Sequence, residues 1–137
     1  DRFKTLSWMK NVLEKNLGST DHVLLYDKDQ IVMEAANANV FFVKGEVLIT
    51  PKSNVVLNGI TRQYLIDHAK DLGLEVRMQE VFLDDLYEFD EIFLTNSLRG
   101  VIQIGETTDF PGLSSKNITK LVQDKYFQLT TPSVYSR

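Results

Sequence analysis

Apolar side chains recur every three or four positions in three segments of the chain, residues 5–17, 60–72 and 114–126. This periodicity predicts three helices. Gly73 follows the second segment and suits the left-handed end of a helix, and the third segment opens on two serines that can cap it. We expect residues 130–137, beyond the third helix, to be frayed.

Short apolar runs between these segments predict strands, several of them paired as hairpins. Residues 22–26 and 30–33 flank a polar turn, which predicts a first hairpin. Residues 40–44 and 47–50 flank a second turn at Gly45, a residue that suits the positive φ of a two-residue connection. Further strands are predicted over residues 74–78, 92–95 and 101–104. The pattern is that of an α/β domain with mixed, hairpin-rich strands.

Acidic residues gather in one segment, residues 80–91, around several apolar side chains. Carboxylates in the first turn of a short helix are stabilised by the positive end of the helix dipole. The alternative is a divalent-metal site, but the segment lacks the flanking Gly or Asn residues of an ion-binding loop. We therefore predict a short helix here and no metal ligands.

The amino-acid composition agrees with one ordinary globular domain and reduces the classes of partner that it can be expected to bind. The 137 residues are 43% hydrophobic and 25% charged, with a formal charge of -4, so the excess of Lys and Arg typical of nucleic-acid binding is missing. The lack of cysteine excludes a disulfide, a thiolate nucleophile and a Cys-ligated metal. Apolar runs stay far below the ~20 residues of a membrane-spanning helix. We expect a cytoplasmic enzyme or binding domain without nucleic-acid or membrane partners.

Three segments contain residues whose chemistry suggests a function beyond their role in the predicted secondary structure. Lys4 precedes the first helix, although most lysines are simply surface residues. Glu34 ends a strand with a buried pattern and is followed by small residues, which let a bulky group approach the backbone. Residues 59–62 lead from a glycine turn into a helix, where free N–H groups and the dipole suit an anion. An ordinary helix N-terminus that binds no anion would show the same sequence pattern.

Taken in order, these segments resemble the fold-type IV pyridoxal-phosphate enzymes, which include branched-chain and D-amino-acid aminotransferases and aminodeoxychorismate lyase. The matching blocks are Lys4-Thr5-Leu6, Glu34 followed by Ala38-Asn39-Val40-Phe41, Thr50-Pro51, Gly59-Ile60-Thr61-Arg62, and residues 90–95. The resemblance implies a mixed, hairpin-rich β pseudo-barrel with flanking helices. It also implies that residues 1–137 form the C-terminal, cofactor-binding domain of a protein that has an N-terminal domain as well.

The resemblance implies that pyridoxal 5'-phosphate is the cofactor and that three residues handle its ring. Lys4 would bond to the cofactor aldehyde and move the α-proton of an amino substrate. Glu34 would hydrogen-bond the pyridine nitrogen and keep it protonated, so that the ring accepts electrons. Leu57 would pack on the face of the ring.

Four further residues are implied to lie at the cofactor phosphate. Ile60 and Thr61 would bind it through their N–H groups, and the Thr61 hydroxyl would add a donor. Asn96 and Ser97 would form the second loop on the phosphate side. Arg62 also belongs to this block, but an arginine in a first helical turn can equally pair with an acidic neighbour.

Residues after the strand at 92–95 distinguish activities within the family. The loop of Asn96, Ser97, Leu98 and Arg99 is more similar to aminodeoxychorismate lyase, which converts 4-amino-4-deoxychorismate to 4-aminobenzoate and pyruvate. Leu98 would narrow the substrate pocket, and Arg99 would either attract a substrate carboxylate or lie solvated in the loop. The alternatives are an aminotransferase for branched-chain or D-amino acids and a non-catalytic domain that keeps the fold. The full-length protein is expected to be a homodimer.

Overall fold

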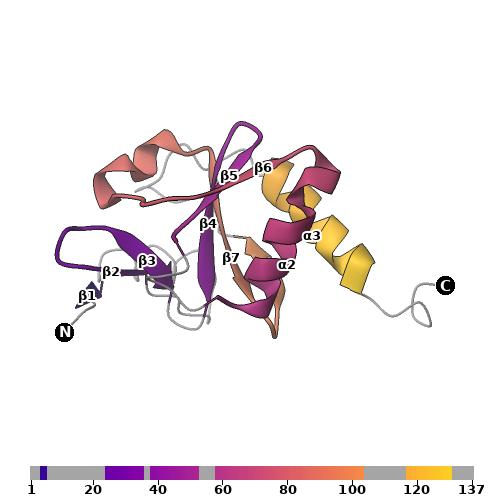
Figure 1. Cartoon of the computed structure of the whole chain (residues 1–137), viewed down its shortest axis with the longest axis horizontal. Helices are drawn as coiled ribbons and strands as arrows, with labels where there is room; N and C mark the ends of the chain where they lie inside the picture. The colour runs from indigo at the N-terminus through magenta and orange to yellow at the C-terminus, as the bar shows by residue number, and fades with distance from the viewer. Residues whose placement is uncertain (1–3, 6–23, 36–37, 53–57, 104–116, 131–137) are drawn as a thin grey trace.

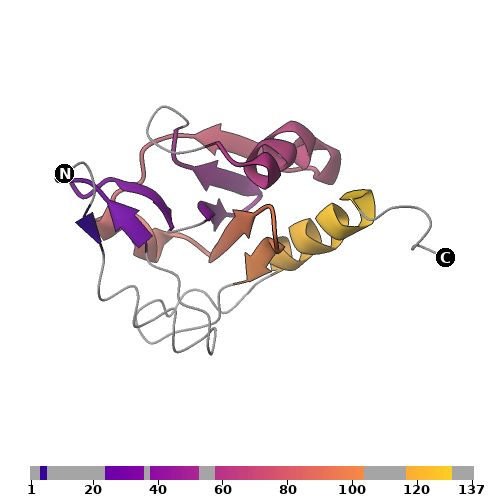
Figure 2. The same ribbon diagram turned by 90° about the horizontal axis from the view of Figure 1, so that it is seen from below.

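Three layers make up the computed structural model, which describes residues 4–5, 24–35, 38–52, 58–103 and 117–130. A five-stranded sheet lies in the middle, with helices α2 and α3 on one side and a small three-stranded sheet on the other (Figure 1). The view from below shows the same order of layers (Figure 2). The mixed, hairpin-rich α/β fold predicted from the sequence is confirmed.

The small sheet has the order β1-β2-β3, with antiparallel neighbours. Its strands are β1 (Lys4–Thr5), β2 (Leu24–Tyr26) and β3 (Val32–Ala35). The first predicted hairpin is confirmed, but β3 begins two residues later than expected. Gln30 has a φ of 64°, and the Asp27 carboxylate accepts the N–H of Asp29 at 2.9 Å and that of Ile31 at 3.0 Å. This side-chain turn keeps residue 30 out of the strand.

The larger sheet has the order β6-β5-β4-β7-β8. Its strands are β4 (Asn39–Lys44), β5 (Val47–Thr50), β6 (Glu75–Met78), β7 (Glu91–Asn96) and β8 (Gly100–Gln103). Only the β5–β6 pair is parallel among these strands, and α2 lies in the crossover that joins the two. Gly45 has a φ of 59° in the β4–β5 turn, so the second predicted hairpin is confirmed.

Strand β4 is buried on both faces because a core lies on each side of it. Val40 and Phe42 belong to the core shared with the small sheet, whereas Phe41 and Val43 belong to the core under the helices. The Phe41 and Phe93 rings stack with centroids 5.1 Å apart and tie β4 to β7. Alternate side chains of one strand thus hold all three layers together.

The second and third predicted helices are present at the expected positions in the chain, but some of their limits differ from the prediction. Helix α2 (Ile60–His68) continues as the 3₁₀ helix η1 (Ala69–Leu72) and ends at Gly73, which has the expected left-handed φ of 76°. The acidic segment is a 3₁₀ helix, η2 (Leu83–Glu88).

Two helix limits differ from the prediction. Helix α3 (Asn117–Thr130) extends four residues past the predicted end at Tyr126, because no glycine or proline follows before Pro132. Thr5 was expected to start a helix but pairs with β2 in a strand, while residues 6–17 lie outside the described residues.

Candidate functional site

An open cleft of about 590 Å³ lies where the ends of β3, β4 and β7 meet the start of α2. Four residues predicted at the cofactor site line it, namely Glu34, Ile60, Asn96 and Ser97. They come from three segments that are far apart in the sequence. Its volume is in the range of small-molecule sites in proteins.

The small sheet brings the backbone of Lys4 near this cleft. Thr5 pairs with Leu25, and Leu25 pairs with Glu34, so β1 and β3 flank the same strand. Two strand spacings amount to roughly 10 Å between the outer backbones. Lys4 and Glu34 therefore belong to one sheet although thirty positions separate them.

Small residues keep the cleft open next to Glu34. Ala35 and Ala38 exchange two backbone hydrogen bonds of 3.0 and 3.1 Å, which folds the chain tightly between β3 and β4. Both alanines line the cleft. The expectation that small residues admit a bulky group beside the glutamate agrees with this geometry.

Thr95 is a site residue that sequence reasoning missed. Its side chain is 0% exposed and lines the cleft, and its hydroxyl has no hydrogen-bond partner among the described residues. A buried hydroxyl without a hydrogen-bond partner costs free energy. Such groups occur at sites where a bound ligand supplies the missing partner. Thr95 ends the resembling block of residues 90–95, but no pattern distinguishes it there from a core threonine.

Asn39 is the second missed residue, and it fixes the start of α2. Its Oδ1 accepts the N–H of Gly59 at 3.2 Å, and it pairs with Thr95 across β4 and β7. The first bond within α2 runs from the Gln63 N–H to the Gly59 carbonyl, so the N–H groups of Ile60 and Thr61 precede the helical ladder. N–H groups that precede the helical ladder suit an anion, and this helix start, with Ile60 in the cleft lining, is hereafter called the anion seat.

The Thr61 hydroxyl points away from the role that the resemblance implies. It is bonded to the Asn96 carbonyl at 3.0 Å and to the Tyr126 hydroxyl at 3.1 Å, and the residue is 1% exposed. Thr61 itself is not among the residues that line the cleft, and its side chain joins α2 to β7 and α3.

Among the described residues, Arg62 pairs with no acidic neighbour, the alternative considered for it above. It is fully buried, and its guanidinium donates to Asn58 Oδ1 and to the Pro51 carbonyl, each at 2.7 Å. Burial lowers the pKa of the Arg62 guanidinium from its ordinary value. Its two bonds hold Pro51 and Asn58 together at the entry to α2.

The two candidate substrate residues lie beside the cleft rather than in its lining. The turn between β7 and β8 is closed by a 2.7 Å bond from the Arg99 N–H to Asn96 Oδ1. Leu98 is 90% exposed, and with Arg99 it lines a second groove, which runs between this turn and α3. Leu57 lies outside the described residues.

A family model described as amino-transferase class IV matches residues 1–107. The chain therefore belongs to the class IV aminotransferase family. Two curated proteins show the range of its relatives. One, provisionally named a branched-chain-amino-acid aminotransferase, from Methanocaldococcus jannaschii, is 34% identical over 93% of this chain and 46% of its own length. D-alanine aminotransferase from Listeria monocytogenes is 35% identical over 80% of this chain and 38% of its own length.

Solved structures of this family share the fold of the chain. An aminotransferase from Brucella abortus, described as bound to the cofactor PLP, has a TM-score of 0.69 at 30% identity over 86% of this chain and 42% of its own. An aminodeoxychorismate lyase from Pseudomonas aeruginosa has a TM-score of 0.69 at 24% identity over 77% and 39%, which is a likeness in fold alone. The chain spans less than half the length of these relatives.

The donor set of the cleft fits the cofactor of class IV aminotransferases, pyridoxal 5'-phosphate. A carboxylate, Glu34, lines the cleft with Ile60 of the anion seat, and so does Thr95, whose buried hydroxyl has no partner among the described residues. A carboxylate can accept a hydrogen bond from a protonated pyridine nitrogen, and the N–H groups at a helix start can bind a phosphate.

Among the described residues, no cluster of three or more His, Asp or Glu side chains is placed to hold a metal ion. None of the helices in this part of the chain combines the length and the apolar character of a membrane-spanning helix.

Proposed function

We propose that this chain binds pyridoxal 5'-phosphate in the cleft and that the protein it belongs to transfers the amino group of branched-chain or D-amino acids. The observation that carries the proposal is the cleft itself, which is lined by both Glu34 and the start of α2. Its partially exposed mouth also gives a small amino substrate access. The relatives named as branched-chain and D-alanine aminotransferases support the substrate class.

Each residue has one task in this proposal. Glu34 accepts a hydrogen bond from the pyridine N–H and keeps that nitrogen protonated, while the N–H groups of Ile60 and Thr61 hold the phosphate. Lys4 would remove the α-proton of the substrate and would return a proton to the former aldehyde carbon of the cofactor. When bound, the cofactor supplies a conjugated ring that accepts the electron pair left at the α-carbon.

Three of the remaining residues shape the walls. Asn96 and Ser97 would close the phosphate side, and Leu57 would lie against the ring. On the same resemblance, we infer that the full-length protein is a cytoplasmic homodimer and that an N-terminal domain completes the substrate pocket. The isolated chain is therefore expected to be inactive, because one wall alone does not hold substrate and catalytic group in a reactive geometry.

Aminodeoxychorismate lyase is the second candidate, and the β7–β8 turn favours it. The family resemblance of residues 96–99 to the lyase is stronger than to the aminotransferases, and Arg99 carries a positive charge at an exposed position of this turn. A lyase would use the same Lys4 and Glu34 but would expel pyruvate, driven by formation of an aromatic ring.

A product assay on the full-length protein separates these activities. Leucine and D-alanine are each offered with 2-oxoglutarate, and glutamate is measured; 4-amino-4-deoxychorismate is offered separately, and 4-aminobenzoate is measured. Amino transfer without 4-aminobenzoate supports the aminotransferase proposal, and the opposite result supports the lyase.

Matched lysine variants of the full-length protein test the proposed base. Lys4→Ala should lower turnover by about 10²- to 10⁴-fold, the usual contribution of a positioned base. Lys28→Ala, at a lysine whose side chain is 83% exposed, should leave turnover unchanged. Equal loss in both variants would refute the assignment of Lys4.

A further inference from the structure

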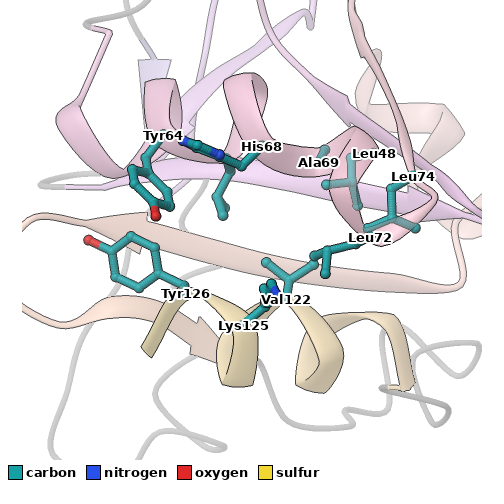
Figure 3. A pocket seen from close by; sticks show the side chains of 10 residues that line it. Leu48, Tyr64, His68, Ala69, Leu72, Leu74, Val122, Lys125 and Tyr126 are labelled. Atoms are coloured by element: carbon teal, nitrogen blue, oxygen red, sulfur yellow. The ribbon is translucent and has the colours of Figure 1, made fainter. Parts of the chain in front are cut away.

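Tyr126 of helix α3 contacts the hydroxyl of Thr61 in the first turn of α2. The helix lies outside residues 1–107, the part of the chain that the family model matches. Figure 3 shows Tyr126 of α3 and Tyr64 of α2 facing each other at one end of the groove between the two helices. Their rings meet edge to face, with centroids 5.4 Å apart.

The direction of the hydrogen bonds at Thr61 follows from its single hydroxyl proton. The Asn96 carbonyl can only accept, so Thr61 donates its proton there, at 3.0 Å. The 3.1 Å contact with Tyr126 must then use the proton of the tyrosine. A directed chain of hydrogen bonds therefore runs from Tyr126 through Thr61 to the last residue of β7.

The ring of Tyr126 also determines where the β7–β8 turn lies. A Cβ on Gly100 would come within 2.8 Å of the Tyr126 ring, and Gly100 has a φ of 73°. Two features therefore favour glycine at this position, namely the positive φ of the backbone and the Tyr126 ring, which leaves no room for a Cβ. Through this contact, Tyr126 supports the turn that carries Ser97.

We propose that Tyr126 is a positioning residue for the phosphate of the cofactor. It acts through Thr61 on the first turn of α2 and through Gly100 on the β7–β8 turn, the two segments that face the phosphate. The inference rests on the proposed function, because it takes the anion seat to hold that phosphate. Its consequence is that α3 contributes to cofactor selectivity without touching the cofactor.

The test compares the affinity of the chain for pyridoxal 5'-phosphate and for pyridoxal, which lacks the phosphate. Tyr126→Phe removes one hydroxyl and keeps the ring on Gly100. Tyr64→Phe is the matched control, since it removes a phenol hydroxyl from the same ring pair and no hydrogen bond of that hydroxyl occurs among the described residues. Binding is measured by calorimetry, and urea unfolding of each variant reports its stability.

In Tyr126→Phe, we expect affinity for pyridoxal 5'-phosphate to fall about threefold to tenfold, the effect of one hydrogen bond. Affinity for pyridoxal should change by less than about twofold, as should both affinities in Tyr64→Phe. A loss of stability alone lowers both affinities together, so the ratio of the two identifies the positioning role.

Two failures are distinguishable. If the unaltered chain prefers the phosphorylated form and Tyr126→Phe keeps that preference in full, Tyr126 has no positioning role and the proposed function stands. If the unaltered chain shows no preference for the phosphorylated form, the anion seat does not bind the phosphate, and both proposals are rejected.

Discussion

Replacing Gly59 with alanine places a methyl group where the start of α2 meets β4. The new Cβ would lie 2.6 Å from Asn39 Oδ1, closer than carbon and oxygen can approach. Gly59 has a φ of -67° and a ψ of 158°, which any residue adopts, so the backbone itself accepts alanine. The cost of Gly59→Ala therefore arises from the Asn39 side chain alone, apart from a small effect on the helix start.

The size of this cost follows from the contacts that must change. Asn39 is 7% exposed and has little room to withdraw, so the clash should cost about 1 to 3 kcal/mol, as for overpacked cores. The 3.2 Å bond from the Gly59 N–H is lost, at about 0.5 to 1.5 kcal/mol. Alanine is also a poorer helix cap than glycine, by roughly 0.5 kcal/mol or more. We expect a total loss of about 2 to 5 kcal/mol.

A double-mutant cycle with Asn39→Ala tests this assignment. Urea unfolding followed by circular dichroism is measured for the unaltered chain, both single variants and the double variant. Without the Asn39 side chain, Gly59→Ala meets no obstacle, so it should cost less than about 1 kcal/mol there. The two substitutions should thus couple by about 1.5 to 4.5 kcal/mol, which is the clash and the lost hydrogen bond together. Additivity within about 0.5 kcal/mol would refute the clash as the cause.

Three further substitutions have definite expected outcomes. The Glu91 carboxylate, 3% exposed, accepts the first N–H groups of α3 at 2.8 and 3.1 Å, so Glu91→Gln should lower urea stability by about 1.5 to 3 kcal/mol; a change below about 0.5 would contradict this capping role. Arg62→Lys keeps the charge but loses one of two anchors, and the same assay should register about 1.5 to 3 kcal/mol of destabilisation, with an unchanged midpoint counting against the bridge. Thr95→Val should leave stability unchanged or raise it by about 1 kcal/mol, while calorimetry should show pyridoxal 5'-phosphate binding about threefold to tenfold weaker; equal binding would exclude the hydroxyl from the site.

Local patterns of the sequence predict the parts of this fold that local chemistry controls. Gly45 and Gly73 adopt the positive φ expected of them, because turn and helix-end geometry depends on few neighbouring residues. The predicted start of β3 differs from the observed one because the Asp27 side chain competes with strand pairing through hydrogen bonds within its own turn. Such competition depends on rotamers, which hydrophobic periodicity does not report.

Contacts between distant segments account for most of what the sequence could not predict at the site. The family resemblance brings Glu34 and Ile60 to one cofactor, and both line the same cleft. It assigns the Thr61 hydroxyl to the phosphate, whereas that hydroxyl bonds to the Asn96 carbonyl and to Tyr126, which lies beyond the resembling blocks. The carbonyl partner of Arg62 likewise has no signature, because any residue type supplies a carbonyl.

The pairing of β4 with β7 has a consequence for how the protein matures. Asn39 lies opposite Thr95, so two walls of the cleft are joined only when segments far apart in the chain have met. Contacts of this kind form late, since closing a long loop costs entropy before the pairing repays it. A growing chain on the ribosome would have to release β7 before any cofactor site exists. Cofactor added during refolding should therefore leave the folding rate unchanged and slow unfolding, because it binds only after the last wall has closed.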